Sequence, residues 1–341
     1  MQQTLRCQSK LQCSWGGNQP PPLFLSGQKF WRLTGGIFLK IVKRKKSKHN
    51  GLFIFLMLLP ALLFIATFTY YPMFRGIVMA FQSYSLWNLS ETRFIGFENF
   101  RTLFRFGSDN VFYSTLWNSV KWVFISLFFQ LHIGFFLALL LKKKFIGRGI
   151  YQGIIFFPWA ISGFMIGIIW RWMFNGHSGV INDILIKVGI LNQPFGFLSE
   201  PGAALYSVIA ANVWYGIPFF TIMILAALQG VPEELYEASQ MDGASSWQKF
   251  LHITLPFIKP VLVLTTLLRG IWILNFPDII YAMTGGGPAG SSHIITTYMI
   301  EKTMSLDYGM ASAVGVIIML ILTLYTIVYL MVSRFEELGD F

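Results

Sequence analysis

The sequence predicts an all-α polytopic membrane protein, and its composition, its hydropathy and the position of its charges all indicate this class. Of the 341 residues, 55% are hydrophobic and only 12% are charged, and the mean hydropathy is +0.58. Water-soluble domains devote about a quarter of their residues to charge. So few charged side chains cannot cover a soluble globule, and lipid must therefore surround most of this chain.

Six apolar stretches are long enough to cross a bilayer as helices. A helix needs about 20 apolar residues to span the hydrocarbon core, because unpaired backbone groups there cost several kcal/mol. The six predicted transmembrane helices are 52–71, 116–141, 154–173, 203–228, 257–280 and 312–332. An even number of spans places both termini on the same side of the membrane.

Most of the formal charge of +11 lies in one tail. Residues 1–50 contain ten Lys and Arg and no acidic residue. This charge does not predict a nucleic-acid partner, because the basic cluster at 43–46 directly precedes an apolar run, where anionic lipid and the positive-inside rule favour the cytoplasm. We predict a basic, largely disordered cytoplasmic tail over 1–50, a membrane domain over 51–335 and a cytoplasmic C-terminus over 336–341.

A second basic cluster supports this orientation. Lys142, Lys143, Lys144 and Arg148 follow the second span, on the side where both termini would lie. The first outer loop, 72–115, is the one observation against it, because that loop contains arginines as well as acidic residues. We therefore predict a multi-pass chain with both termini in the cytoplasm.

Residues 229–256, between the fourth and fifth spans, contain the start and end signals of two short helices, which a simple connecting loop would not need. Pro232 suits a first helical position, and the two glutamates after it suit the positive end of a helix dipole. Gly243 can end this helix in the left-handed conformation, and Ser245 or Ser246 can cap a second helix that closes at Leu255-Pro256. The pattern predicts a rigid helix-turn-helix that another protein can grip, with an ordinary structured loop as the alternative.

The same segment resembles a known motif. Glu237-Ala238-Ser239-x2-Asp242-Gly243-Ala244-x8-Ile253-x-Leu255-Pro256 is similar to the EAA motif of ABC-importer permeases, with Ser239 where that motif usually has Ala. The resemblance implies the type I ABC importer permease fold, whose first cytoplasmic helix inserts into a groove of an ATPase subunit. The residues that it assigns to this coupling contact are Glu237, Ala238, Ser239, Asp242, Gly243 and Ala244.

A second stretch is similar to the carbohydrate-uptake branch of these permeases, which includes the maltodextrin and glycerol-phosphate permeases. It runs from Asn275-Phe276-x-Asp278 through a loop containing Gly286, Gly287 and Pro288 to Asp307-Tyr308-Gly309. The resemblance covers roughly residues 50 to 335. It implies a permease subunit in the bacterial cytoplasmic (inner) membrane that forms half of the path for a sugar or oligosaccharide.

An ionisable residue in the fifth span marks a candidate substrate path. A charge in mid-membrane is costly, so Arg269 should face the bundle interior or a wet cavity. Trp272, Ile273 and Phe276 share its face at helical spacing. An interhelical salt bridge or hydrogen-bond anchor would explain Arg269 equally well.

The fourth span carries a second candidate stripe, in which Asn212, Tyr215, Gly216 and Phe219 lie at i, i+3, i+4 and i+7. Sugar hydroxyls need directional hydrogen bonds, while the apolar faces of sugar rings stack on aromatic side chains. In maltose-type permeases the corresponding stripe lines the sugar site, so the resemblance implies the same role here. Helix packing is the alternative at each position.

The remaining polar residues of the spans predict no further site. Gln130 and His132 are expected to have satisfied packing roles in the second span. His177, His252 and His293 lack the spacing of metal ligands, so we predict no metal site.

The chain is predicted to be a transport subunit rather than an enzyme, and to bind no cofactor. It contains no G-x4-G-K-[ST] loop, so ATP and Mg²⁺ would be bound by partner subunits. The resemblance implies four kinds of partner: a second permease subunit in a heterodimer, two ATPase subunits, an extracytoplasmic solute-binding protein and the lipid bilayer. The alternatives are an ion-coupled secondary transporter, an ABC permease for a non-sugar solute such as glycerol phosphate, and a membrane enzyme.

Overall fold

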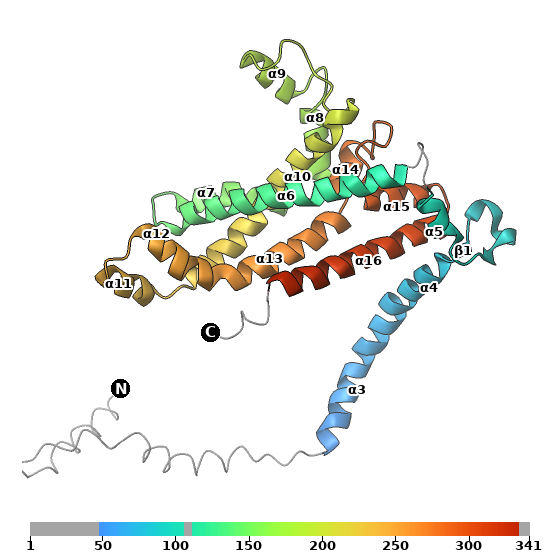
Figure 1. The fold of residues 1–341 in the computed structure, drawn as a ribbon, viewed down its shortest axis with the longest axis horizontal. Helices are drawn as coiled ribbons and strands as arrows, with labels where there is room; N and C mark the ends of the chain where they lie inside the picture. The colour runs from blue at the N-terminus through green and yellow to red at the C-terminus, as the bar shows by residue number, and fades with distance from the viewer. Residues whose placement is uncertain (1–47, 106–110, 334–341) are drawn as a thin grey trace, which may run out of the picture. The chain divides into compact units, whose positions relative to one another are not determined.

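The computed structural model describes residues 48–105 and 111–333, and the chain divides into two units, Met1–Tyr70 and Tyr71–Phe341 (Figure 1). Most of the predicted basic tail and the predicted C-terminal segment 336–341 lie outside the described residues. The described chain is helical except for loops and one antiparallel hairpin of β1 (Gln82–Ser83) and β2 (Arg93–Phe94). The all-α prediction is therefore confirmed.

The first unit consists, in its described part, of α3 (Lys48–Ile65) and the π-helical turn η1 (Ala66–Tyr70). These elements carry no acidic residue and are almost wholly apolar. They begin the stretch Gly51–Met79, which is long and apolar enough to span a membrane. The first predicted span, 52–71, lies within this stretch.

Four long helices form the frame of the second unit (Figure 1). They are α6 (Val111–Lys142), α10 (Pro201–Gln229), α13 (Leu255–Asn275) and α16 (Tyr308–Ser333). Helices α6 and α10 approach so closely that a Cβ atom on Gly134 would lie 2.6 Å from the Cβ of Phe220. In lipid, where apolar side chains gain little by leaving the solvent, such small residues let helices pack by direct contact.

The third predicted span is not a straight helix. Helix α7 (Arg148–Phe156) and the 3-10 turn η3 (Phe157–Ala160) are followed by α8 (Gly163–Met173) at a bend of 99°. The bend occurs because Ile161 and Ser162 adopt extended backbone angles between the two helices. Within the described residues, five helices are long enough to span a membrane, and six spans result if this bent pair counts as one.

The prediction that Leu255-Pro256 ends the second cytoplasmic helix is wrong. The helical stretch Ser246–Met283 continues past it, through α12 (Ser246–Lys249), the π-helical turn η4 (Phe250–Thr254) and α13. Proline lacks an amide proton and clashes with the carbonyl four residues earlier in an α-helix. The wider π-helical turn before Pro256 changes that geometry, so the proline begins α13 instead of ending α12.

The fifth predicted span, 257–280, is interrupted near its end. Helix α13 stops at Asn275, because Phe276 leaves the helical conformation and Pro277 follows it. The indole Nε1 of Trp122, on α6, donates a 2.8 Å hydrogen bond to the carbonyl of Ile273 in this last helical turn. That bond satisfies a carbonyl for which the helix itself has no partner.

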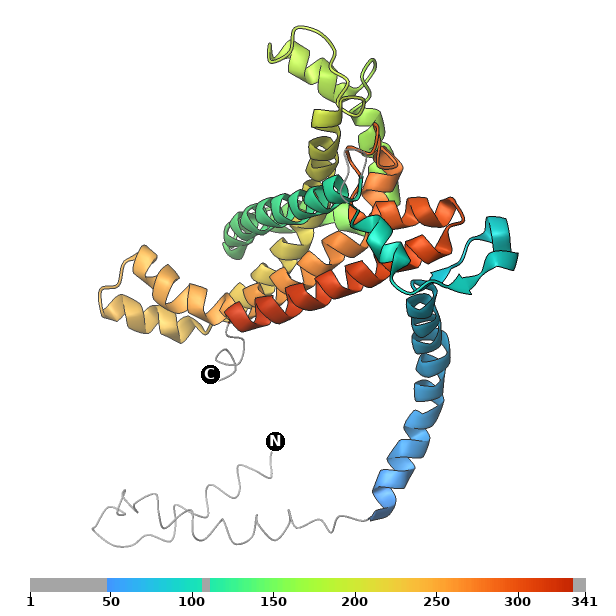
Figure 2. The same ribbon diagram turned by 45° about the vertical axis from the view of Figure 1, so that its right-hand side comes forward.

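Shorter elements complete the second unit at the ends of the long helices. They are α4 (Tyr71–Met79), η2 (Leu86–Glu91), α5 (Glu98–Leu103), α9 (Val180–Lys187), α11 (Glu233–Met241), α14 (Asp278–Met283) and α15 (Ile295–Met304). Both ribbon views place α11 and α12 at one end of α6 and α13, and α5 and the β-hairpin at the opposite end (Figures 1 and 2). Figure 1 also shows α14 away from the helix-turn-helix, on the part of the bundle toward α15.

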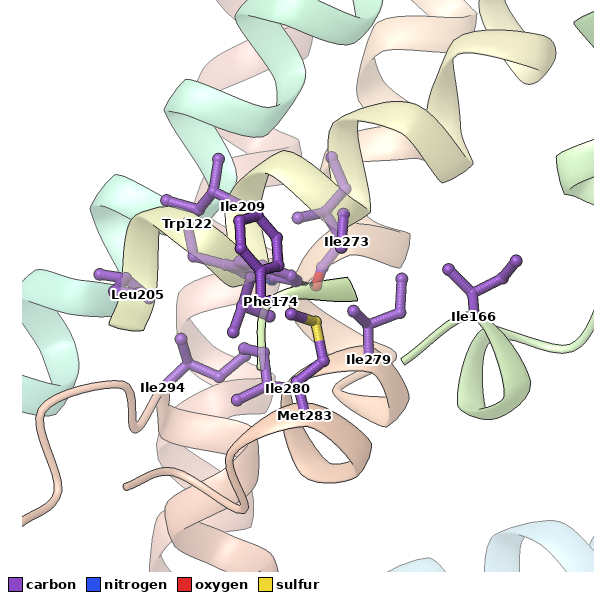
Figure 3. Packing of buried hydrophobic residues seen from close by; sticks show 12 residues of the cluster. Trp122, Ile166, Phe174, Leu205, Ile209, Ile273, Ile279, Ile280, Met283 and Ile294 are labelled. Atoms are coloured by element: carbon purple, nitrogen blue, oxygen red, sulfur yellow. Dashed lines mark hydrogen bonds between the residues drawn. The ribbon is translucent and has the colours of Figure 1, made fainter. Parts of the chain in front are cut away.

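The largest buried apolar cluster joins five helices and two loops of the second unit (Figure 3). Trp122 from α6, Leu205 and Ile209 from α10, and Ile280 and Met283 from α14 are among its members. Because α14 packs into this cluster, the chain that follows it is held against the bundle.

Candidate functional site

A buried polar cluster joins α6, α10 and α13 inside the bundle. The guanidinium Nε of Arg269 donates a 2.8 Å hydrogen bond to Oε1 of Gln130, and Nε2 of Gln130 donates a 2.8 Å bond to the backbone carbonyl of Asn212. Gln130 is completely buried, and Arg269 is 5% exposed. One glutamine side chain therefore connects the cation on α13 with the backbone of α10.

Gly216 provides the space that this glutamine occupies. A Cβ atom on Gly216 would lie 2.1 Å from the amide carbon of Gln130, far inside van der Waals contact. Gly216 thus lies behind the candidate site. Its lack of a side chain lets α6 bring the amide of Gln130 close to Arg269.

A cavity of about 320 Å³ lies beside this cluster. Its volume is at the lower end of the range for small-molecule pockets. The lining residues are Trp159, Gly163, Asn212, Tyr215, Arg269, Trp272, Ile273, Phe276, Asp278 and Ile279.

Five of the seven predicted path residues line this cavity: Asn212, Tyr215, Arg269, Ile273 and Phe276. Phe276 does so from the loop after α13, so it does not share a continuous helical face with Arg269 as the spacing predicted. The other two, Gly216 and Phe219, are buried outside the lining. The guanidinium carbon of Arg269 lies 5.8 Å from the ring centre of Phe219 and 5.8 Å from that of Tyr215, within the range of cation–π attraction.

The cavity offers hydrogen-bond donors beside aromatic rings. Nδ2 of Asn212 is buried and has no hydrogen-bond partner within the described chain. Because an unsatisfied buried donor is costly, a bound acceptor oxygen would be favoured at this position. Trp159, Trp272 and Phe276 add ring surface to the same cavity.

Sequence reasoning missed several residues of this site. The sequence predicts a satisfied packing role for Gln130, and nothing in the spacing of α6 links this residue to Arg269. Trp159 and Gly163 enter the cavity because of the bend in the third span, which the hydropathy pattern does not reveal. Asp278 belongs to the second family-like stretch, and that signal could have identified it.

The predicted helix-turn-helix is present at the opposite end of the bundle. Helix α11 begins directly after Pro232, which is its N-cap and not its first helical residue. Gly243 has a φ of +77°, the left-handed conformation predicted for the end of this helix. Ser245 caps α12 in a capping box, in which Gln248 N donates to Ser245 Oγ and Ser245 N donates to Gln248 Oε1.

The six predicted coupling residues lie along α11 and the turn after it. Glu237, Ala238, Asp242 and Gly243 are exposed, whereas Ser239 and Ala244 are half-buried. Large apolar side chains are exposed on both helices of the helix-turn-helix, Leu235 and Met241 on α11 and Trp247 on α12, and Met241 is 90% exposed. A rigid element that exposes apolar side chains among charged ones has the character of a protein-binding surface.

The loop containing Gly286, Gly287 and Pro288 is folded around His293. Gly286 has a φ of +95°, and a Cβ atom on it would lie 2.1 Å from the imidazole of His293. The hydroxyls of Thr284 and Ser292 lie 2.8 Å apart and close the loop from inside. This loop lines a second hollow of about 450 Å³ with Arg171, Asn175 and Ser199, among other residues.

His293 is a buried titratable group in this loop. Burial lowers the pKa of His293 below its ordinary value of 6.5, and the carboxylate of Glu301 only partly offsets this effect. Nε2 of His293 lies 2.9 Å from a carboxylate oxygen of Glu301, and Nδ1 lies 3.1 Å from the hydroxyl of Thr297. The imidazole of His293 thus anchors the loop to α15.

We predict that Gln130→Met destabilises the bundle by about 1.5–3 kcal/mol, because it leaves the buried Arg269 without its acceptor. The free energy of unfolding of the purified chain in detergent measures this loss. Gln130→Glu keeps an acceptor for Arg269 and should retain more stability. Equal losses in both variants would contradict the assigned role of Gln130.

We predict that His293→Gln reduces the dependence of stability on pH below neutrality. A lowered pKa means that the unfolded chain takes up this proton first, so the wild-type chain loses stability as the pH falls below 6.5 toward the folded pKa. Thermal unfolding in detergent between pH 7.5 and 5 tests this difference. Parallel curves for the two proteins would rule the assignment out.

Two relatives cover most of this chain. The trehalose/maltose transport system permease protein MalF of Thermococcus litoralis is 34% identical over 83% of this chain and 94% of its own length. The sulfoquinovosyl glycerol transport system permease protein SmoG of Agrobacterium fabrum is 35% identical over 83% of this chain and 90% of its own. Each match covers more than four fifths of this chain.

A solved structure shares the fold. A chain of a bacterial ABC transporter involved in import of the acidic polysaccharide alginate matches with a TM-score of 0.72 and 27% identity, over 84% of this chain and 96% of that one. Residues 130–336, which include α10, the helix-turn-helix and the cavity, match the family of binding-protein-dependent transport system inner membrane components. This match rules out the alternatives of an ion-coupled secondary transporter and a membrane enzyme. The chain belongs to this family and is a permease subunit of an ABC importer.

Proposed function

We propose that this permease subunit imports a sugar or an oligosaccharide and that the substrate passes the cavity beside Arg269. The composition of that cavity carries the proposal. Asn212 and Arg269 supply directional donors, while Trp272 and Phe276 supply ring faces. This combination suits a saccharide, whose hydroxyls need hydrogen bonds and whose ring faces are apolar.

The relatives support a saccharide without selecting one. Their names refer to trehalose and maltose, to sulfoquinovosyl glycerol and to diacetylchitobiose, and the solved neighbour is described as an alginate importer. These compounds differ in charge and in substituents, but all carry sugar rings. Glycerol phosphate is the non-sugar alternative, and the cation of Arg269 at the cavity is the observation that favours it.

The proposed working complex contains a second permease subunit, two ATPase subunits that bind ATP and Mg²⁺, and an external solute-binding protein. A solved neighbour supports the last partner, because it is a bacterial alginate ABC transporter in complex with an alginate pentasaccharide-bound periplasmic protein. Gly287 and Pro288 line a hollow at the end of the bundle away from α11. We assign the loop containing Gly286, Gly287 and Pro288 to the outer side, where it would face the binding protein.

The exposed face of α11 would receive the ATPase subunit. Glu237, Ala238, Asp242 and Gly243 lie on or beside this face, with Ser239 and Ala244 packed beneath it. The basic loop at 142–148 lies at the same end of the bundle as α11 (Figure 1), which supports a cytoplasmic location for this end. Closure of the ATPase subunits around ATP would then move α11 and open the path at Arg269.

The substrate proposal predicts that one class of saccharide, presented by the binding protein, stimulates ATP hydrolysis in the reconstituted complex. ATPase rates in proteoliposomes with a panel of mono- and oligosaccharides, and with glycerol phosphate as the control, measure this response. Stimulation by glycerol phosphate alone would overturn the saccharide assignment. Uptake by the purified chain alone, without ATPase subunits, would overturn the proposed coupling.

The coupling proposal predicts that Gly243→Val lowers transport without unfolding the bundle. A β-branched residue at a φ of +77° costs about 1–3 kcal/mol of local strain, while a Cβ atom there meets no atom within 4 Å. Gly243→Asn is the matched control, because asparagine tolerates this conformation. Transport and co-purified ATPase are measured for both variants, and wild-type transport by Gly243→Val would remove the support for this contact.

A further inference from the structure

The side chain of Tyr236 connects helix α11 to the bundle. Most of α11 is exposed, but Tyr236 is half-buried and packs against an apolar cluster that includes Ala138 and Leu141 of α6. The nearby contact of Gln240 with Lys249 joins α11 only to α12, within the same segment. Among the described contacts of α11, those of Tyr236 lead out of the helix-turn-helix into the spans.

The hydroxyl of Tyr236 lies in a directed chain of hydrogen bonds. The ammonium of Lys142, in the last turn of α6, donates to Tyr236 Oη across 3.1 Å and lies 4.4 Å from the centre of the same ring. Tyr236 Oη lies 2.8 Å from Thr254 Oγ1, and Thr254 Oγ1 lies 3.5 Å from the carbonyl of Lys249. If the hydroxyl of Thr254 donates to that carbonyl, Tyr236 donates to Thr254 while it accepts from Lys142.

Thr254 stands where the helical geometry changes. It is the last residue of the π-helical turn η4, directly before α13, and it is 5% exposed. The same turn contacts α6 through the rings of Phe250 and Phe135, whose centres lie 6.0 Å apart. A single π-helical turn within an α-helix is a common feature of functional sites and gives a long helix a place to bend.

We propose that the Tyr236 hydroxyl is a positioning group that transmits displacement of α11 to both α6 and α13. This inference rests on the proposed coupling function. A hydrogen bond weakens steeply once its two atoms separate beyond about 3.5 Å. A shift of α11 by a fraction of a helical turn must therefore either break the hydrogen bonds of Tyr236 or move Lys142 and Thr254 with it. Because α13 also carries Arg269, movement of Thr254 at its start reaches the helix that lines the cavity.

The test uses the full complex in proteoliposomes and measures the substrate transported per ATP hydrolysed. Tyr236→Phe keeps the ring and its contact with Lys142 but removes both hydroxyl bonds. We expect this ratio to fall by about threefold to tenfold, the effect of a typical hydrogen bond, while the amount of co-purified ATPase subunit stays at the wild-type level. Tyr206→Phe, at an exposed tyrosine on α10, is the matched control and should keep the wild-type ratio.

A double-mutant cycle separates this link from a general loss of stability. Thr254→Val removes the bond between Thr254 and Tyr236 and should lower the ratio, and the double variant should lower it no further than Tyr236→Phe alone, because Tyr236→Phe already breaks that bond. Thr254→Ser keeps the hydroxyl and should preserve the ratio. An unchanged ratio in Tyr236→Phe, or multiplied losses in the double variant, would overturn the proposal.

The wild-type complex distinguishes this failure from a failure of the proposed function. If the wild-type chain does not co-purify with an ATPase subunit or does not drive ATP-dependent uptake, the coupling function itself is wrong. If the wild-type complex transports and Tyr236→Phe transports with the same ratio, only the role assigned to Tyr236 is wrong.

Discussion

The membrane part of this protein is organised around the need to satisfy one buried cation. Arg269 lies in the middle of α13, where lipid and apolar side chains offer no compensating group. The amide of Gln130 meets this requirement from α6, and it bonds at the same time to the backbone of α10. This arrangement requires a glycine at position 216, because the side chain of any larger residue would occupy the space that Gln130 fills.

The same arrangement leaves a hydrogen-bond donor and a positive charge at a cavity. Nε of Arg269 is bonded to Gln130, while its charge lies near the rings of Tyr215 and Phe219, and Asn212 retains a buried donor without a partner in the described chain. The hydrogen bond of Arg269 matches its interpretation as an anchor, and its position at a cavity leaves the role in a substrate path a proposal. The cluster is an interhelical anchor on one side and part of a cavity lining on the other.

Irregular backbone occurs where movement would be needed. The π-helical turn η4 lies between the helix-turn-helix and α13, and the bend at Ile161 and Ser162 lies beside the cavity. The helix-turn-helix itself is rigid, because a capping box and a glycine at a positive φ hold its turn. A rigid element joined to the spans through a deformable turn is the arrangement that a mechanical input requires.

Local signals predicted much of the fold and part of the site. Hydropathy identified every apolar stretch, and Gly243 and Ser245 marked the turn of the helix-turn-helix, because end signals depend on backbone geometry within a few residues. Pro256 gave a wrong prediction of a helix end, because this signal too was judged only from the neighbouring residues. Its effect on a helix depends on the preceding turn, which here is π-helical and is held by packing against Phe135 and Tyr236.

The sequence by itself determined that this chain lies in lipid as a helical bundle, and that Asn212, Tyr215 and Arg269 belong to helices able to share an interior. It also determined the family, because the helix-turn-helix motif is continuous along the chain. Only the tertiary structure decided that Gln130 bonds to Arg269, that the third span bends and brings Trp159 to the cavity, and that Tyr236 joins α11 to α6. These contacts link residues far apart in the chain, and such pairings depend on how helices pack rather than on any local pattern.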